Sequence, residues 1–256
     1  MSLQGKVAMV TGAGRGIGWT IARVLAEQGM ALAVNDVQAE LALGSARELR
    51  SKGFRAMDSP ADITDRAQVE AMMERVEAEL GPLWLLVNNA GVYFSAPTAE
   101  MSEEDWDKAF AVDAKGVFLC SQAAIRRMIP RRKGRIVNIS SIAGVIVRTN
   151  QIGYCSAKAA VVHFSRCLAV EMAPHGVTVN CICPGMTRTE MLVQGARERK
   201  MNLEAMTARI PAGRMALPED HANLVAYFAS EEAGHVTGQV VCVDGAQSLF
   251  LPLVAD

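Results

Sequence analysis

The stretch Thr11-Gly12-Ala13-Gly14-Arg15-Gly16-Ile17-Gly18 follows directly on an aliphatic run, residues 7–10, near the start of the chain. The run is typical of a buried strand, and the glycines after it permit a tight turn into a helix. Glycine also lets a pyrophosphate approach backbone N–H groups at the helix N-terminus. The spacing of Gly12, Gly16 and Gly18 differs from that of the common dinucleotide fingerprint. We therefore predict a strand, a phosphate-binding turn and a helix; a turn that merely links the two elements is the alternative.

The rest of the chain alternates short aliphatic runs with longer helical patterns. Runs that read as strands buried on both faces cover residues 7–10, 31–34, 83–87, 135–139 and 177–180. Helical periodicity covers residues 17–28, 39–51, 66–79, 103–127 and 154–172, and Gly29, Gly53 and Gly81 follow helices as C-terminal caps. This alternation predicts an α/β fold, a doubly wound, mostly parallel sheet of Rossmann type in three α/β/α layers. Without an internal linker or repeat, residues 1–256 are expected to form a single domain.

Composition narrows the class of protein. Half of the 256 residues are apolar and the formal net charge is −1, with acidic and basic residues interspersed. A nucleic-acid-binding surface would need a basic patch or stripe. No apolar run approaches the roughly 18 residues of a membrane span, and no secretory pattern opens the chain. We expect a cytoplasmic protein with no nucleic-acid or membrane partner.

The cysteines and histidines lack the spacing of a metal site. None of the six cysteines forms a C-x-x-C pair, and most lie inside apolar segments such as 179–183. Free cysteine behaves as a small hydrophobic residue, so buried free thiols are the expectation. The four histidines are scattered along the chain. No metal is therefore assigned.

The acidic residue at the end of the second predicted strand bears on cofactor choice. Asp36 lies eighteen residues beyond Gly18. A carboxylate there can accept a hydrogen bond from the adenosine ribose 2′-hydroxyl and would repel a 2′-phosphate. Arg15 argues the other way, because a basic side chain in the glycine turn can reach a 2′-phosphate. Since Asp36 stands at the discriminating position, NAD is the expected cofactor in preference to NADP.

A serine, a tyrosine and a lysine follow in an order that suits proton transfer. Tyr154 and Lys158 are four residues apart, so they share one helix face, and Ser141 ends the strand upstream. A tyrosine has an ordinary pKa of about 10, and a nearby ammonium lowers it by stabilising the phenolate. Tyr154 can then act as general acid/base while Ser141 hydrogen-bonds the substrate oxygen. A tyrosine packed on a helix is the alternative for Tyr154 alone.

Taken together, these motifs resemble the short-chain dehydrogenase/reductase family, in its single-domain branch of about 250 residues. The resemblance covers nearly the whole chain. Its motifs are the glycine turn 11–18, Asn88-Asn89-Ala90-Gly91, the catalytic Ser141, Tyr154 and Lys158, Pro184-Gly185 with Thr189, and Val243-Asp244-Gly245. The resemblance implies hydride transfer between a nicotinamide cofactor and a secondary alcohol or ketone.

The resemblance also implies cofactor contacts. Lys158 would bind the nicotinamide ribose beside Tyr154. Contacts in the turn and on the adenosine side would come from Gly12, Arg15, Gly16, Ile17, Gly18, Asp36, Asp62 and Ile63. Contacts along the rest of the cofactor would come from Asn89, Ala90, Gly91, Pro184, Gly185, the backbone of Thr187, and Thr189.

One residue departs from the family pattern. Family members commonly carry asparagine in the fourth helix, where it anchors a water in a proton relay to the lysine. This chain has Asp113 in Val112-Asp113-Ala114-Lys115-Gly116. Aspartate accepts the same hydrogen bonds but donates only when protonated, and its charge favours the ammonium form of Lys158. We expect a relay with a shifted pH optimum; a tolerated substitution is the alternative.

The substrate is less well defined by sequence. Residues 142–151 lie between Ser141 and Tyr154 and mix aliphatic with polar side chains, while Tyr93 and Phe94 can add an aromatic wall. A polyol or sugar-like alcohol fits this loop. The alternative enzyme is a 3-oxoacyl thioester (acyl carrier protein) reductase, and the alternative of another class is a non-catalytic NAD-binding regulatory protein.

Two larger features are also predicted. Residues 186–217, rich in methionine and arginine, leave the carboxyl edge of the sheet and are expected to form a lid over the substrate, or else an ordinary surface excursion. By resemblance, helices 103–127 and 154–172 would form the interface of a homodimer or homotetramer. A core-facing stripe would show the same pattern in the second helix.

Overall fold

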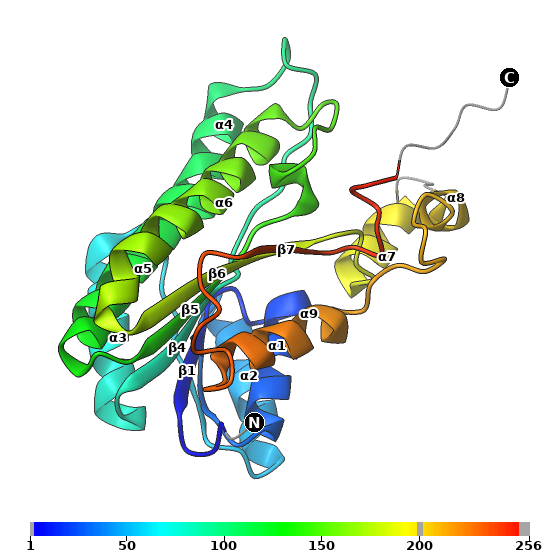
Figure 1. Cartoon of the computed structure of the whole chain (residues 1–256). Helices are drawn as coiled ribbons and strands as arrows, with labels where there is room; N and C mark the ends of the chain where they lie inside the picture. The colour runs from blue at the N-terminus through cyan, green and yellow to red at the C-terminus, as the bar shows by residue number, and fades with distance from the viewer. Residues whose placement is uncertain (1–2, 199–201, 251–256) are drawn as a thin grey trace, which may run out of the picture.

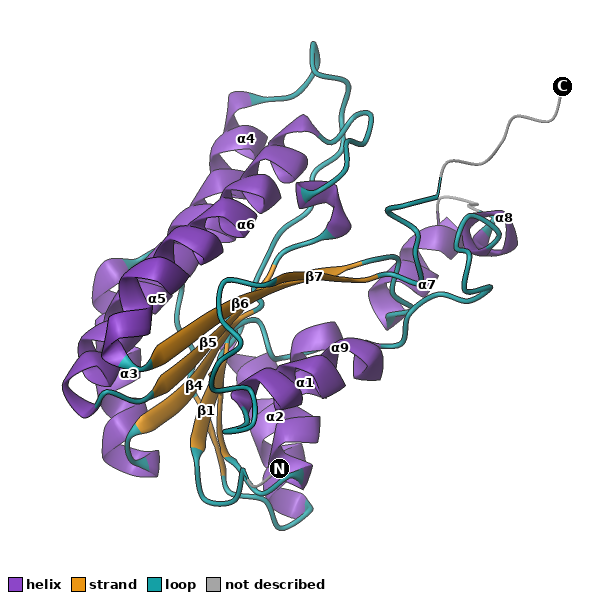
Figure 2. Ribbon diagram, viewed as in Figure 1, coloured by secondary structure: helices purple, strands orange, loops and turns teal. Residues whose placement is uncertain are grey.

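The computed structural model describes residues 3–198 and 202–250, and this part of the chain folds around one parallel sheet. Its seven strands run in the order β3-β2-β1-β4-β5-β6-β7. Helices α1, α2 and α9 cover one face, and α3, α4, α5 and α6 cover the other (Figures 1 and 2). The predicted doubly wound α/β/α sandwich in a single domain is confirmed.

The elements have the following bounds. The strands are β1 Val7–Val10, β2 Ala31–Val34, β3 Ala56–Asp58, β4 Leu83–Asn88, β5 Gly134–Ile139, β6 Val177–Pro184 and β7 Val240–Val243. The helices are α1 Gly16–Glu27, α2 Ala39–Ser51, α3 Arg66–Leu80, α4 Glu103–Phe110, α5 Val117–Met128, α6 Ile152–Met172, α7 Glu190–Glu198, α8 Leu203–Thr207 and α9 Pro218–Ala229.

Strand β1 is apolar on both faces because helices cover both. Along β1, Ala8 and Val10 join the core beneath α1 and α9, whereas Val7 and Met9 join the core beneath α3 and α5. All four side chains are buried. Successive strand residues point to opposite faces, so a continuous aliphatic run is needed where both are dry.

The structure differs from the predicted helix 103–127. A π-helical segment, Ala111–Gly116, separates α4 from α5. Such segments widen one turn and often lie at functional sites, and this one contains Asp113. Elements β3, β7 and α9 were not among the predicted strands and helices. The predicted caps Gly29, Gly53 and Gly81 all have positive φ, as helix-ending glycines do.

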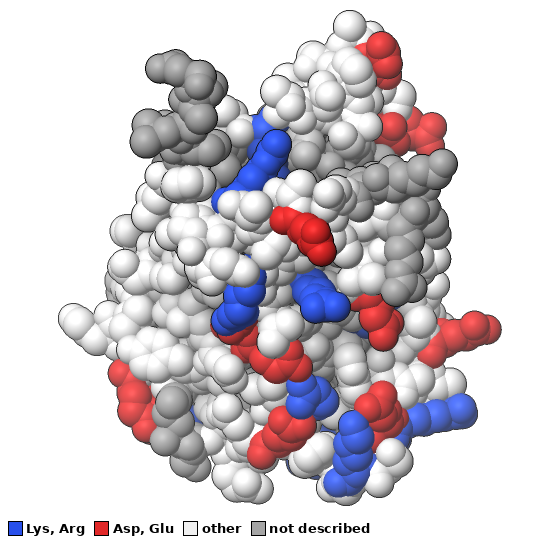
Figure 3. Space-filling model, turned by 90° about the vertical axis from the view of Figure 1, so that its right-hand side faces the viewer, with Lys and Arg blue, Asp and Glu red and all other residues white. Residues whose placement is uncertain are grey.

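Charged side chains are interspersed on the surface. On the face shown in Figure 3, acidic and basic groups alternate across the lower part of the molecule. Among residues 3–198 and 202–250, no helix has both the length and the apolar character to cross a membrane.

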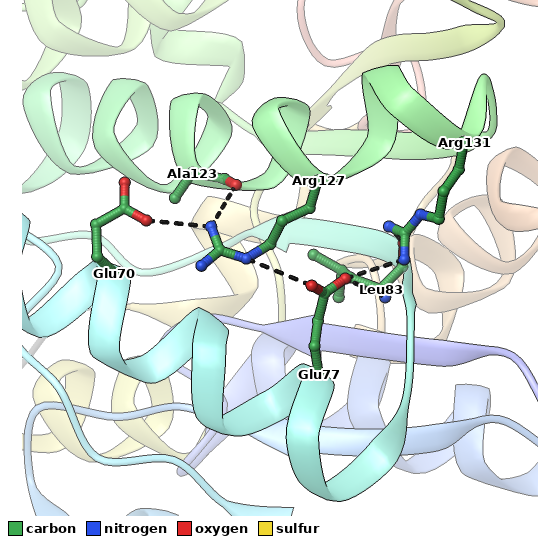
Figure 4. A network of polar contacts seen from close by, with 6 residues as sticks. All are labelled: Glu70, Glu77, Leu83, Ala123, Arg127 and Arg131. Atoms are coloured by element: carbon green, nitrogen blue, oxygen red, sulfur yellow. Dashed lines mark hydrogen bonds and ion pairs between the residues drawn. The ribbon is translucent and has the colours of Figure 1, made fainter.

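A network of ion pairs joins α3 to α5 and the turn after it (Figure 4). The Glu77 carboxylate accepts hydrogen bonds from Arg131 at 3.0 Å and from the Leu83 backbone N–H at 3.1 Å. The Arg127 guanidinium forms ion pairs with both carboxylates: its Nε lies 3.6 Å from Glu77 Oε2, and its Nη1 lies 3.1 Å from Glu70 Oε2. These contacts hold the end of α3 against the start of β4.

We expect Glu77→Ala to lower the free energy of unfolding by about 1–2 kcal/mol, because a backbone N–H and two arginines lose their shared acceptor. Glu79→Ala is the matched control on the same helix. It removes only the exposed pair with Arg75, so no more than about 0.5 kcal/mol should be lost. Urea denaturation measures both values. Equal losses in the two variants would contradict a special role for the network.

Candidate active site

The candidate site lies where the sheet order reverses. Strand β1 has β2 on one side and β4 on the other, so the loops after β1 and β4 leave toward opposite faces. Such a switch point opens a crevice at the carboxyl ends of the strands. The glycine turn, Asn89–Gly91, Ser141 and the segment 184–189 all follow strands at this edge.

The glycine turn is held against the loop after β4. The Thr11 hydroxyl oxygen accepts from the backbone N–H groups of Asn89 and Ala90, at 3.0 and 3.1 Å. In return the Asn89 side-chain amide donates to the carbonyls of Thr11 and Gly12, at 2.9 and 3.0 Å. Asn89, expected to line the cofactor, therefore also ties the two loops together. Thr11 was quoted in the motif, but its own role was missed.

Two glycines of the turn are required by close packing. Gly12 has φ +59°, and a Cβ there would come within 2.7 Å of Ala90 Cα. A Cβ on Gly18 would come within 2.4 Å of the Asn89 side chain. Helix α1 begins at Gly16, after the extended and exposed Arg15. The bare turn and the helix N-terminus fit a pyrophosphate group.

Asp36 stands beside this turn. Its carboxylate accepts from the Gly14 N–H at 3.2 Å and from the Gln38 N–H at 3.0 Å, and the residue is buried. Asp36 therefore lies beside the glycine turn, and its predicted contact with an adenosine ribose stays a prediction. Asp62 accepts from the backbone and hydroxyl of Thr64, both at 2.8 Å, and so shapes the turn before α3.

The residues predicted to transfer the proton lie close together on and around α6. The Lys158 ammonium lies 5.7 Å from the centre of the Tyr154 ring and is almost fully buried. The Tyr93 ring, one of the two predicted for an aromatic wall, meets the Tyr154 ring edge-on, with centroids 5.2 Å apart. Burial opposes the charge of Lys158, but Asp113 and then Tyr154 hold the pKa of this ammonium above its ordinary value.

The hydroxyl groups of the two serines after β5, Ser140 and Ser141, make different hydrogen bonds. The Ser140 hydroxyl is buried and donates to the Lys158 carbonyl at 2.8 Å. The Ser141 hydroxyl oxygen accepts from the Ala143 N–H at 3.1 Å. That contact leaves the Ser141 hydroxyl proton for another acceptor. The geometry thus favours Ser141, the predicted residue, over Ser140 as a donor to substrate.

Asp113 lies next to the ammonium group of Lys158. Its side chain is fully buried; Oδ1 accepts from the Val92 N–H at 2.8 Å and lies 3.8 Å from the Lys158 ammonium. Oδ2 has no hydrogen-bond partner among the described residues. Burial raises the pKa of this carboxyl, against the opposing effect of Lys158. A Cβ on Gly91 would lie 2.9 Å from Asp113, so glycine is needed there for the close approach.

The segment after β6 closes the other side of the crevice. Gly185 donates to the Val243 carbonyl at 3.0 Å, and a Cβ there would come within 2.5 Å of Asp244. The Thr189 hydroxyl accepts from Leu192 N–H at the start of α7. Thr187 contacts His221 of α9, a residue that sequence reasoning missed because the two are 34 positions apart and no motif contains the histidine.

The sequence also predicts that the cysteines are buried free thiols. All six cysteines are free. Cys120, Cys181 and Cys183 are buried as expected, but Cys167 is exposed, because α6 turns that side away from the sheet. Within the part of the chain that the structure describes, no group of three or more His, Cys, Asp or Glu side chains is placed to hold a metal ion.

Comparison with known proteins places the chain in a family. The family model described as enoyl-(acyl carrier protein) reductase matches residues 12–246. A (2S)-[(R)-hydroxy(phenyl)methyl]succinyl-CoA dehydrogenase subunit of Thauera aromatica is 38% identical, over 98% of this chain and 99% of its own. A 3-oxoacyl-[acyl-carrier-protein] reductase of Staphylococcus aureus is 38% identical, over 94% of this chain and 97% of its own.

A solved structure agrees. A gluconate 5-dehydrogenase from Burkholderia cenocepacia, in complex with NADP and tartrate, superposes with a TM-score of 0.92 and 34% identity, covering 97% of each chain. The chain therefore belongs to the short-chain dehydrogenase/reductase family. It is an oxidoreductase that acts on CH–OH or carbonyl groups with a nicotinamide cofactor.

Proposed function

We propose that the protein transfers a hydride between NAD and a secondary alcohol or its ketone, with Tyr154 as general acid/base. The observation that carries the proposal is the buried ammonium of Lys158 below the Tyr154 ring, at the same sheet edge as the glycine turn. When bound, the nicotinamide supplies or accepts the hydride. Tyr154 takes the proton from the substrate hydroxyl during oxidation and returns it during reduction, a contribution typically worth about 10²–10⁴ in rate.

The other two residues support that proton transfer. Lys158 stabilises the Tyr154 phenolate by its charge and donates to the nicotinamide ribose. Ser141 donates its hydroxyl proton to the substrate oxygen and so stabilises charge as it develops. The dinucleotide would lie along the glycine turn, Asp36, Asp62 and Ile63, the loop 89–91 and the segment 184–189.

NAD is the proposed cofactor because of Asp36. Two backbone N–H groups, those of Gly14 and Gln38, hold its carboxylate beside the glycine turn, where the adenosine ribose is proposed to bind. A 2′-phosphate at that point would face a fixed negative charge. The similar gluconate 5-dehydrogenase was crystallised with NADP, so the choice in this chain has to rest on its own residues.

A polyol or sugar-like alcohol is the proposed substrate. A hollow between the loop 147–150 and the start of α6 has residues on both sides of the catalytic candidate Tyr154 in sequence and is lined by Thr98, Val147, Arg148, Thr149, Asn150, Ile152, Cys155 and Ser156. Its polar side chains can offer hydrogen bonds to hydroxyl groups. The gluconate 5-dehydrogenase likeness supports this class. Helices α7 and α8, within the predicted lid 186–217, lie beyond the ends of β6 and β7 (Figure 1) and are proposed to cover the substrate; residues 199–201 lie outside the described residues.

The second candidate activity is 3-oxoacyl thioester reduction. It is favoured by the matching reductase family model and by the 38% identical reductase of Staphylococcus aureus. Steady-state assays in both directions, with polyols and 3-oxoacyl thioesters, separate the two. Greater kcat/KM for a thioester with NADPH would replace the polyol proposal. Saturable NADH binding without turnover of any substrate would point to the non-catalytic alternative.

We propose that Asp113 tunes the pH dependence of the reaction. Asp113→Asn keeps an acceptor for the Val92 N–H but removes a negative charge 3.8 Å from Lys158. That carboxylate opposes formation of a phenolate nearby, so its removal should move the rising limb of kcat/KM for oxidation to lower pH, by about one unit. Asp107→Asn, an exposed change on α4, is the control. Superimposable profiles for wild type and Asp113→Asn would remove Asp113 from the mechanism.

A further inference from the structure

A buried histidine of α9 contacts the segment after β6. His221 is fully buried, and its Nε2 lies 2.8 Å from the hydroxyl oxygen of Thr187, which is also buried. The inward neighbours of His221 on α9 include Ala222, Val225 and Ala226, all apolar. A single imidazole in this apolar helix face is therefore a departure that packing does not explain.

The hydrogen bonds at Thr187 fix the state of the imidazole. The Thr187 hydroxyl lies 2.9 Å from the Gly185 carbonyl, which can only accept, so threonine donates its proton there. His221 Nε2 must then carry a proton and donate to Thr187. The remaining nitrogen, Nδ1, is buried without a partner among the described residues. The result is a chain of two bonds that runs from α9 through Thr187 to Gly185.

The histidine stays neutral over the ordinary pH range. Burial lowers the pKa of His221 to about 4, while the neighbouring Asp220 acts in the opposite direction. The Asp220 carboxylate is itself engaged by Arg214 at 2.7 Å and by the Leu217 N–H at 2.7 Å. His221 is therefore a constant hydrogen-bond donor to Thr187 in neutral solution.

The backbone around Thr187 is also held by hydrogen bonds to Ala216. Thr187 forms a parallel bridge with Ala216: Arg188 N–H donates to the Ala216 carbonyl, and Ala216 N–H donates to the Met186 carbonyl, at 2.8 and 2.9 Å. In parallel pairing these bonds come from the residues that flank Thr187. The N–H and C=O of Thr187 itself point away from Ala216. The C=O accepts from the Thr189 N–H at 2.9 Å, whereas the N–H has no acceptor among the described residues and so can donate to a ligand while the side chain is tied to α9.

We propose that His221 is a positioning residue, which through Thr187 holds the segment 184–189 in the shape that binds the nicotinamide half of the dinucleotide. This inference rests on the proposed cofactor site. His221 touches neither substrate nor cofactor in this scheme; it acts on them through the threonine. An apolar residue at position 221 would fill the helix face but leave the Thr187 side chain held by the Gly185 carbonyl alone.

The test compares two probes of the crevice in the full chain. NADH fills both halves of the proposed site, whereas AMP fills only the adenosine half near Asp36. We expect His221→Leu to weaken NADH binding about tenfold, the effect of one lost hydrogen bond, and to change AMP binding less than twofold. His221→Gln retains a side-chain N–H and should recover most of the NADH affinity. Fluorescence titration measures NADH, and competition measures AMP.

Thr187→Val cuts the same link from the other end and leaves α9 intact. It should reproduce the NADH loss, and adding His221→Leu should weaken binding little further, because one interaction is removed twice. If His221→Leu does not fold, Thr187→Val alone tests whether the contact between His221 and Thr187 supports NADH binding. Unchanged NADH binding in the foldable variants would overturn the role of His221 alone, as would equal losses for NADH and AMP. Absence of NADH binding in the wild-type protein would overturn the proposed cofactor site itself.

Discussion

Tyr154→Phe should lower kcat about 10³-fold and change the affinity for NADH less than about twofold. The substitution removes the one group proposed to exchange a proton with the substrate oxygen, an effect of about 10²–10⁴ for general acid–base catalysis. The ring itself, with its edge-on contact to Tyr93 and its place above Lys158, is kept. Initial rates and NADH titration, on the same preparation, give the two values.

Tyr227→Phe is the matched control for this experiment. Tyr227 lies on α9, where its ring packs against Phe228, far along the chain from the catalytic residues. Its activity should match wild type. If Tyr154→Phe retained more than about a tenth of wild-type kcat, another group would have to carry the proton, and the proposed role of Tyr154 would be wrong.

Asp36→Asn should reduce the preference for NAD over NADP roughly thirtyfold, measured as the ratio of kcat/KM values. Two unit charges about 4 Å apart near a protein surface interact by roughly 4 kcal/mol, and salt and relaxation remove about half of that. Asparagine still accepts from one of the two N–H groups that hold Asp36, those of Gly14 and Gln38. The turn should therefore keep its conformation, so the change reports mainly on charge.

Arg15→Gln tests the competing interpretation, in which Arg15 binds the 2′-phosphate of NADP and decides cofactor choice. Arg15 is exposed at the N-terminus of α1, so its removal should alter the use of NADP far less than removal of the Asp36 charge. An unchanged ratio in Asp36→Asn, together with a collapse of NADP use in Arg15→Gln, would show that the arginine decides cofactor choice. Parallel assays with both cofactors at one ionic strength measure the effect.

The sequence predicts the sheet well where strands are buried on both faces. Runs such as Val7–Val10 and Ala31–Val34 must be aliphatic to contact helices on both sides, and that need is visible in the residues. Strand β3, Ala56–Asp58, has three residues at the sheet edge and too little pattern to identify. Strand β7, Val240–Val243, does carry an aliphatic run before Asp244, a signal that was present but unused.

In the candidate site, too, the sequence reveals some residues and not others. Tyr154 and Lys158 are recognisable because helical spacing alone puts them on one face. The π-helical segment around Asp113 has no compositional signal, because it depends on a shift of backbone hydrogen bonding within an otherwise helical sequence. The contact between His221 and Thr187 joins two elements that only the folded chain brings together. Tertiary contacts of this kind leave no periodic pattern.

We propose that this protein oxidises a secondary alcohol with NAD. The most direct test follows absorbance at 340 nm with the purified protein, NAD or NADP, and a panel that runs from polyols to 3-hydroxyacyl thioesters. We expect NADH formation with polyol-type alcohols, much slower reduction of NADP, and loss of the signal in Tyr154→Phe. No absorbance change with any member of the panel, despite saturable NADH binding, would contradict it.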